Sequence, residues 1–233
     1  MSGPSILDFA RMANAAYDSS DPLIPTYTRI YYGELASGFK AARYTANVGG
    51  SSVTIVAFAG TDFDRTDGPA DILADVGFAG PGMLSLVSQI SPVLGLALFA
   101  GQRQLMDQVA GALEFTRQAQ FFSGSGNPIF LTGHSLGGGL AQIIGSTLDV
   151  RGVSFNAPAV SQMGFSISDP NRFYNVNQAR DPVSTRTAAI GHHLGTVINI
   201  DNGTNGMDAH LIVPVISYLE SGPGGPTGAR QLF

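Results

Sequence analysis

A serine stands between glycines in the stretch Gly133-His134-Ser135-Leu136-Gly137, which follows a short apolar run and precedes a helical pattern. A serine hydroxyl is a weak nucleophile, so a protein that uses it must hold it on a sharp turn within reach of a base, and flanking glycines let such a turn form. The G-x-S-x-G pattern between a strand and a helix is typical of a nucleophile elbow. We predict that Ser135 attacks a carbonyl carbon; the alternative is a glycine-rich turn with an incidental serine.

A serine nucleophile of this kind needs a carboxylate and then a histidine later in the chain. Asp181 follows the predicted strand at residues 173–176, so its carboxylate falls at the carboxyl end of a strand, where α/β proteins form their sites. We predict Asp181 as the acid, with a simple Asp-Pro turn as the alternative. Three other aspartates are less suitable as the acid. Asp169 precedes its strand, and Asp201 and Asp208 lie too close to the candidate histidine.

One of the four histidines must then serve as the base. His210 follows the last predicted strand and a loop, and it opens the final apolar helix, so its imidazole can fold over the elbow. His134 lies inside the elbow, where we expect it to pack or to form a hydrogen bond rather than to act as the base. We expect His192 and His193 to be solvated loop residues. The order of the residues along the chain therefore favours His210 as the general base.

The negative charge of a tetrahedral intermediate needs hydrogen-bond donors. One expected donor is the backbone amide of Leu136, directly after the serine, and the other is an amide from the loop after an earlier central strand. The predicted strand at residues 53–58 runs into Ala59-Gly60-Thr61. Gly60 lets the backbone approach a substrate, and Thr61 can offer both its N–H and its hydroxyl. We predict that Thr61 and Leu136 form an oxyanion hole.

These residues need a scaffold, and the hydrophobic patterns of the chain supply one. Strands that alternate with helices predict an α/β fold, in which a mostly parallel central sheet carries helices on both faces. The first helix opens with a capping signal, because Ser5 stands three residues before Asp8. The predicted helices span residues 6–17, 103–122, 136–148 and 209–220, and the predicted strands span residues 27–35, 39–46, 53–58, 129–131, 153–155, 173–176 and 197–200.

Composition and charge exclude several classes of protein. The 233 residues carry a net charge of −5, and the eleven arginines and one lysine are scattered singly, so we expect no nucleic-acid binding. The absence of cysteine excludes a disulfide scaffold and a cysteine nucleophile. Metal-binding and phosphate-binding motifs are missing, so we expect no metal and no cofactor. Because no linker divides the chain, we predict one domain over residues 1–233, with a flexible tail over about 221–233.

The longest uncharged run covers residues 76–102. Residues 83–101 are numerous enough to span a bilayer. However, the first half of this segment is polar and contains Pro92, and a membrane span there would separate the strand at 53–58 from the elbow. We therefore do not expect a transmembrane helix. Two readings stay open: a buried helix pair, or an insertion at about 76–101 that forms a lid or an acyl-binding wall. In the second case the expected substrate-binding residues are Leu94, Leu96, Leu98 and Phe99.

The motifs together resemble the class 3 lipases, the family of fungal triacylglycerol lipases and their bacterial and plant relatives. The resemblance runs nearly end to end, and these segments carry it: Ala15-Ala16-Tyr17, Phe58-Ala59-Gly60-Thr61, residues 71–75, residues 133–138, Asn156-Ala157-Pro158, Asp181-Pro182-Val183 and His210. It implies an α/β-hydrolase fold, a triad of Ser135, Asp181 and His210, and an oxyanion hole of Thr61 and Leu136.

Two residues depart from the pattern of that family. An arginine usually stands at the position of Ala59, and a tryptophan usually lies in the helix represented by residues 71–75; both are missing here. Neither is a nucleophile or a base in the family. The departures therefore concern the support of the oxyanion loop and the substrate preference.

The resemblance predicts hydrolysis of carboxylic esters of lipids through an acyl-enzyme, as in a triacylglycerol lipase. The alternatives are a phospholipase A1 or another membrane-lipid esterase, including an exported effector, and a non-catalytic lipid-binding protein that kept the fold. The expected partners are the ester substrate and, transiently, a membrane or lipid surface. Asp8 and Arg11 interrupt the apolar pattern of the N-terminus, so we expect no Sec signal peptide. We accordingly expect the protein to be cytoplasmic or to be exported by another route. The sequence does not predict an oligomeric state.

Overall fold

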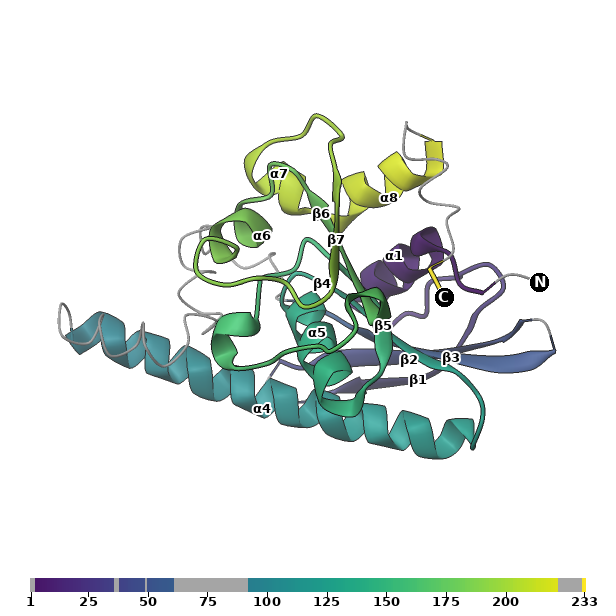
Figure 1. Ribbon diagram of the computed structural model, residues 1–233. Coiled ribbons are helices and arrows are strands. Elements are labelled where there is room, and N and C mark those ends of the chain that lie inside the picture. Colours follow the sequence, from purple (N-terminus) through teal and green to yellow (C-terminus); the bar gives the residue numbers. More distant parts are fainter. Residues whose placement is uncertain (1–2, 36–37, 49, 61–91, 222–231) are drawn as a thin grey trace.

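A single mixed sheet forms the centre of the molecule (Figure 1). The computed structural model describes residues 3–35, 38–48, 50–60, 92–221 and 232–233, and for residues 92–102 and 221 it describes the backbone alone. Within these ranges seven strands lie side by side in chain order. They are β1 (Thr28–Glu34), β2 (Lys40–Val48), β3 (Ser51–Phe58), β4 (Ile129–His134), β5 (Arg151–Phe155), β6 (Phe173–Gln178) and β7 (Thr196–Ile200).

The pairing of neighbouring strands changes from antiparallel to parallel at β3. Strands β1, β2 and β3 pair in an antiparallel manner, as short connections allow, whereas each pair from β3 to β7 is parallel. Val56 of β3 lies opposite Leu131 of β4, and Phe58 lies opposite Gly133. All five parallel strands therefore end at the same edge of the sheet, and the loops that follow them meet there.

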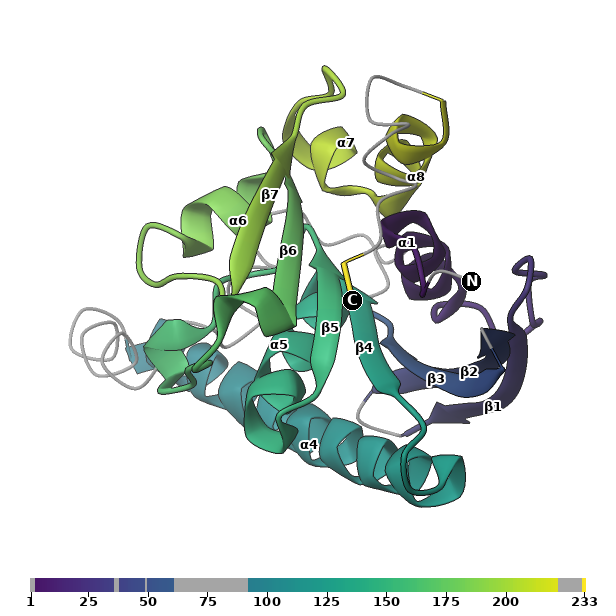
Figure 2. The ribbon, with the colours of Figure 1, turned by 45° about the vertical axis from the view of Figure 1, so that its right-hand side comes forward.

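Helices cover both faces of this sheet, as the two views show (Figures 1 and 2). Helices α1 (Ile6–Ala15) and α8 (Ile212–Ser221) lie on one face, and α4 (Pro92–Ser123) and α5 (Leu136–Leu148) lie on the other. This arrangement confirms the predicted α/β fold with a mostly parallel sheet. The shorter elements are α6 (Pro182–Thr187), α7 (Gly206–His210), η1 (Ser161–Met163) and η2 (Pro170–Arg172).

The alternation of side chains along β3 explains why this strand is central. Val53, Ile55 and Ala57 belong to the core under α1 and α8, whereas Val56 and Phe58 belong to the core under α4 and α5. Both sides of the strand are therefore apolar, as in a strand that is covered on both faces. Burial of the two faces fixes the register that brings the ends of β3 and β4 together.

The capping signal of the first helix is confirmed. The Ser5 hydroxyl accepts a hydrogen bond from the Asp8 amide at 3.2 Å, and the Asp8 carboxylate accepts one from the Ser5 amide at 2.9 Å. The helix ends at Ala15, earlier than predicted. Tyr17 consequently lies just beyond the helix, at the edge where the parallel strands end.

The structure corrects two of the predicted elements and adds a third. Helix α4 has 32 residues, about 48 Å at 1.5 Å per residue, and begins at Pro92, before the predicted start at 103. Helix α6 was not predicted. The predicted helix at 209–220 is two helices, because Leu211 is extended with ψ 144°. No helix in the described ranges combines the length and apolarity that a bilayer crossing requires.

Two predicted segments lie largely outside the described residues. Of the insertion at about 76–101, residues 76–91 lie outside them, and residues 92–101 form the first turns of α4. Of the tail at 221–233, residues 222–231 lie outside them. At the end of the chain, the Phe233 ring stacks on Phe130 with 5.1 Å between the ring centroids.

Candidate active site

Ser135 occupies the strained turn that joins β4 to α5. Its φ is 57° and its ψ is −128°, a backbone conformation that a residue with a side chain rarely adopts. Its amide donates to the Phe155 carbonyl at the end of β5 at 3.0 Å. Although Ser135 is the N-cap of α5, its hydroxyl does not cap the helix. The hydroxyl is therefore free to point away from the helix, as an elbow requires.

The glycines around Ser135 are needed for close backbone approach. A Cβ at Gly137 would meet the carbonyl oxygen of Phe58, and a Cβ at Gly133 would meet the backbone of Gly137. A Cβ at Gly138 would lie 2.7 Å from the Cβ of Ala157, closer than real contacts allow. Any larger residue at these positions would push α5 away from the ends of β3 and β4.

The three predicted triad residues lie in one line of hydrogen bonds. His210 Nε2 is 2.8 Å from Ser135 Oγ, and His210 Nδ1 is 2.8 Å from Asp181 Oδ1. All three side chains are buried. Because an ionised carboxylate only accepts hydrogen bonds, the proton of the neutral imidazole lies on Nδ1, and the bare Nε2 accepts from the serine hydroxyl. This geometry lets the imidazole remove the serine proton.

The backbone of α6 fixes the Asp181 carboxylate. Asp181 is the N-cap of this helix, and its two oxygens accept hydrogen bonds from the amides of Val183 at 3.0 Å and Ser184 at 2.9 Å. Burial raises the pKa of the Asp181 carboxyl, but hydrogen bonds from His210 and Ser184, with the charge interaction with His210, lower it below its usual value. The carboxylate is therefore ionised and held in a position to orient His210.

His134 forms hydrogen bonds with both ring nitrogens, in line with the prediction that it does not act as the base. Nδ1 is 2.9 Å from the Tyr17 hydroxyl, and Nε2 is 2.7 Å from the His210 carbonyl oxygen. Burial is the main cause that lowers the pKa of His134 to about 3, and the neighbouring His210 adds to it. The ring is therefore neutral near pH 7.

The prediction that both His192 and His193 are solvated is wrong for His193. His192 is exposed, with its Nδ1 2.9 Å from the Ser161 hydroxyl. His193 is buried, and its Nε2 lies 3.1 Å from the Asn177 side-chain amide nitrogen. The next residue, Leu194, packs in the core beside α5, which draws His193 inward. Burial lowers the pKa of His193 to about 4.

Only one half of the predicted oxyanion hole lies in the described residues. Leu136 is the first residue of α5, where amides have no partner within the helix and where the helix dipole favours negative charge. Thr61 lies outside the described residues. Its neighbour Gly60 approaches the elbow so closely that a Cβ there would lie 3.0 Å from the Cβ of Ser135. The loop after β3 thus starts beside the nucleophile.

The predicted substrate-binding residues lie in the first turns of α4, whose backbone alone is described: Leu94, Leu96, Leu98 and Phe99. In Figure 1 this end of α4 projects beyond the other elements. Their side chains lie outside the description, so their role stays a prediction.

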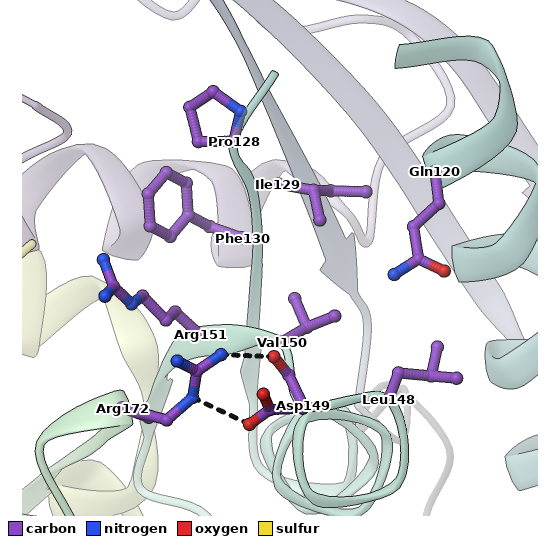
Figure 3. A pocket seen from close by; sticks show the side chains of 9 residues that line it. All are labelled: Gln120, Pro128, Ile129, Phe130, Leu148, Asp149, Val150, Arg151 and Arg172. Carbon is purple, nitrogen blue, oxygen red and sulfur yellow. Dashed lines mark hydrogen bonds and ion pairs between the residues drawn. The ribbon is translucent and has the colours of Figure 1, made fainter. Parts of the chain in front are cut away.

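Two cavities lined by described residues lie away from the nucleophile. One of about 360 Å³ opens where β4 and β5 begin, at the edge opposite Ser135, and Figure 3 shows Arg172 pairing with Asp149 beside it. Another of about 660 Å³ is lined by Ser184 and His193, among others. Neither of these two is lined by Ser135 or His210. The hydrogen bonds between Ser135, His210 and Asp181 identify the candidate site. The described residues also hold no group of three His, Asp or Glu side chains suited to a metal ion.

Two residues at the site had no predicted function: Tyr17 and Asn156. The sequence shows only a tyrosine after a helix and an asparagine after a strand. Asn156 has φ 45°, a left-handed conformation that asparagine tolerates better than most residues. The available signals were their places in Ala15-Ala16-Tyr17 and Asn156-Ala157-Pro158, two segments that carry the resemblance to the class 3 lipases.

The sheet, the elbow and the arrangement of helices define an α/β-hydrolase fold. Among solved structures, the chain is similar to lipase II from Rhizopus niveus, with 18% sequence identity, a TM-score of 0.51, and coverage of 86% of this chain and 81% of that chain. A lipase from Rhizopus microsporus var. chinensis (17%, TM-score 0.47, 86% and 75%) and a triacylglycerol lipase from Penicillium expansum (16%, TM-score 0.47, 88% and 80%) also match. No family model matches the sequence, and no curated protein matches it.

Proposed function

We propose that this protein is a serine hydrolase of the class 3 lipase type, which cleaves carboxylic esters of lipids through an acyl-enzyme. The observation that carries the proposal is the line of hydrogen bonds from Asp181 through His210 to Ser135 on a strained turn. A glycine-rich turn with an incidental serine would not need a buried histidine and a buried carboxylate in this order. We call Ser135, His210 and Asp181 the candidate triad.

The proposed reaction uses the candidate triad in each of its steps. The Ser135 oxygen forms a bond to the ester carbonyl carbon while its proton moves to His210 Nε2, and the carbonyl π electrons move to the oxygen. The amide of Leu136, with that of Thr61, stabilises the resulting oxyanion. Collapse of the intermediate breaks the bond to the alcohol, which takes the proton from His210 and leaves an acyl-serine. Water, activated by the same imidazole, then releases the fatty acid.

The evidence for a lipid substrate is less direct than that for the reaction. The uncharged run at residues 76–102, the low charged fraction of 12% and the fold that this chain shares with lipase II from Rhizopus niveus all favour a lipid ester. In this proposal the first turns of α4 form part of the acyl-binding wall or of its lid. The substrate would reach the site from a lipid surface.

The proposal can be tested with wild type and Ser135→Ala, using three substrates: p-nitrophenyl butyrate, a triacylglycerol emulsion and phosphatidylcholine vesicles. Wild type should release fatty acid from at least one lipid, and Ser135→Ala should lose activity by about a million-fold, to the level set by binding and the oxyanion hole. A fluorophosphonate should label Ser135 alone. Preference for phosphatidylcholine would indicate a phospholipase, and binding to vesicles without turnover of any ester would indicate a non-catalytic lipid-binding protein.

A further inference from the structure

The backbone carbonyl of His210 accepts hydrogen bonds from two buried side chains. His134 Nε2 lies 2.7 Å from this oxygen and Asn156 Nδ2 lies 2.9 Å from it, and Asn156 Nδ2 also donates to the Ala209 carbonyl at 3.0 Å. His134 ends β4 and Asn156 follows β5. The two side chains therefore tie the short helix α7, which lies beside α6 in Figure 1, to the strands that hold Ser135.

The break between α7 and α8 leaves this carbonyl available. Pro214 stands four residues after His210, where a continuous helix would place an N–H that donates to the His210 carbonyl. Proline has no N–H, and its ring would clash with that carbonyl. Leu211 is instead extended, and α8 begins at Ile212. The sequence itself thus prevents the helix from using an oxygen that His134 and Asn156 bind.

These contacts fix the position of the protons on His134. A carbonyl oxygen only accepts, so Nε2 must carry the proton that it donates to His210. Because burial lowers the pKa of His134 to about 3, the ring is neutral and Nδ1 is bare. The Tyr17 hydroxyl, 2.9 Å from Nδ1, must then donate to it. Tyr17 therefore favours the one tautomer of His134 that can hold the base.

The orientation of Asn156 is fixed in a similar way. Its Oδ1 accepts from the Gln178 amide at 2.8 Å, which is possible only for the oxygen of the side-chain amide. Nδ2 is thereby directed at the two carbonyls of α7. The Asn156 backbone amide donates to the Val176 carbonyl at 3.0 Å, so the residue is attached to β6 as well.

From these contacts we infer that His134 and Asn156, with Tyr17 behind His134, are positioning residues that place the His210 imidazole between Ser135 and Asp181. This role rests on the proposed function, in which His210 is the base. The neutral state of His134 also helps His210 to take up a proton, because the centroids of the two rings lie only 5.0 Å apart. A positive charge there would oppose the imidazolium that forms when His210 takes the serine proton.

A pair of substitutions at His134 separates positioning from simple packing. His134→Leu fills the volume but cannot donate, whereas His134→Gln offers an amide N–H near the place of Nε2. For p-nitrophenyl butyrate we expect His134→Leu to lower kcat about ten- to a hundred-fold with KM changed less than about twofold, because a small displacement of a catalytic group has an effect of this size. His134→Gln should restore kcat to within about threefold of wild type. The exposed His192→Leu is the matched control, with no expected effect.

A second measurement reports the position of His210 without any substrate. The proton between His210 Nδ1 and Asp181 should give a far-downfield resonance in the proton NMR spectrum of wild type, which should persist in His134→Gln and be lost or broadened in His134→Leu. If wild type hydrolyses no ester but the resonance behaves in this way, the positioning role stands and the proposed function fails. An unchanged resonance and kcat in folded His134→Leu, or a loss that His134→Gln does not restore, would overturn the inference.

Tyr17→Phe keeps the test decisive if His134→Leu does not fold. It removes the proton donated to His134 Nδ1 and leaves the ring in place. We expect kcat to fall about three- to tenfold and the downfield resonance to broaden, because the other tautomer of His134 then becomes populated. Wild-type kcat together with a wild-type resonance in this variant would also overturn the inference.

Discussion

Lowering the pH from 7 to 5 should destabilise this protein through two buried neutral histidines. In the folded protein the pKa of His134 is lowered to about 3 and that of His193 to about 4, while an unperturbed histidine has a pKa near 6.5. Below pH 6.5 the unfolded chain takes up protons at both residues, and the folded protein does not. The free energy of unfolding therefore falls as the pH falls, until the folded pKa values are reached.

The size of this effect follows from the two pKa values. One pKa unit corresponds to about 1.4 kcal/mol, so between pH 7 and pH 5 each histidine contributes a loss of about 2 kcal/mol. The two together remove about 4 kcal/mol, a large part of the roughly 5–15 kcal/mol by which a typical domain is stable. Carboxyl groups of the unfolded chain contribute little in this range, since their pKa values lie near 4.

Urea unfolding followed by circular dichroism at several pH values between 7 and 5 measures this loss. The His134→Gln variant has no imidazole at this position, so its loss of stability should be about half that of wild type, and His193→Gln should behave in the same way. A wild-type free energy of unfolding that stays level would refute the reasoning. So would a His134→Gln variant that loses as much stability as wild type, since His134 would then be protonated in the folded protein.

Three further predictions concern the reaction and the elbow. His210→Ala should lower kcat/KM for an ester by about as much as Ser135→Ala, whereas His192→Ala should stay within about tenfold of wild type; the opposite ranking would move the base to another histidine. Gly137→Ala should lower both the melting temperature and the activity, because its Cβ meets the Phe58 carbonyl, and a stable, fully active variant would contradict this. Replacement of Leu96 and Leu98 by aspartate should reduce kcat/KM for long-chain esters more than for p-nitrophenyl butyrate, and an unchanged ratio in a folded variant would exclude a role in acyl binding.

The elbow and most of the strands could be predicted from the sequence because their signals are local. The glycines around Ser135 and the apolar run at residues 53–58 each lie within a few residues of the chain, and the helix at 136–148 begins and ends where the pattern indicates. Asp181 shows a limit of such signals. The sequence allows either a catalytic acid or an Asp-Pro turn at this position. In the structure the residue caps α6, and its carboxylate also contacts His210, as the proposed acid must.

The parts that could not be predicted depend on distant contacts. The burial of His193 follows from the packing of Leu194 beside α5, which no nearby residue indicates. The break at Leu211 follows from Pro214, whose effect depends on the carbonyl four residues earlier. Tyr17 lies 117 residues from its partner His134, so their contact appears only in three dimensions.

The strict chain order of the sheet has a consequence for the synthesis of this protein. Every strand pairs with the strand that precedes it, so the sheet can grow from its N-terminal side while the C-terminal part is still being made. The elbow closes once β5 is present, because the Ser135 amide binds the Phe155 carbonyl, and Asp181 follows β6. His210 arrives last, after β7. Under the proposed function, a chain still on the ribosome therefore displays Ser135 without His210, so it would not hydrolyse an ester before His210 has emerged.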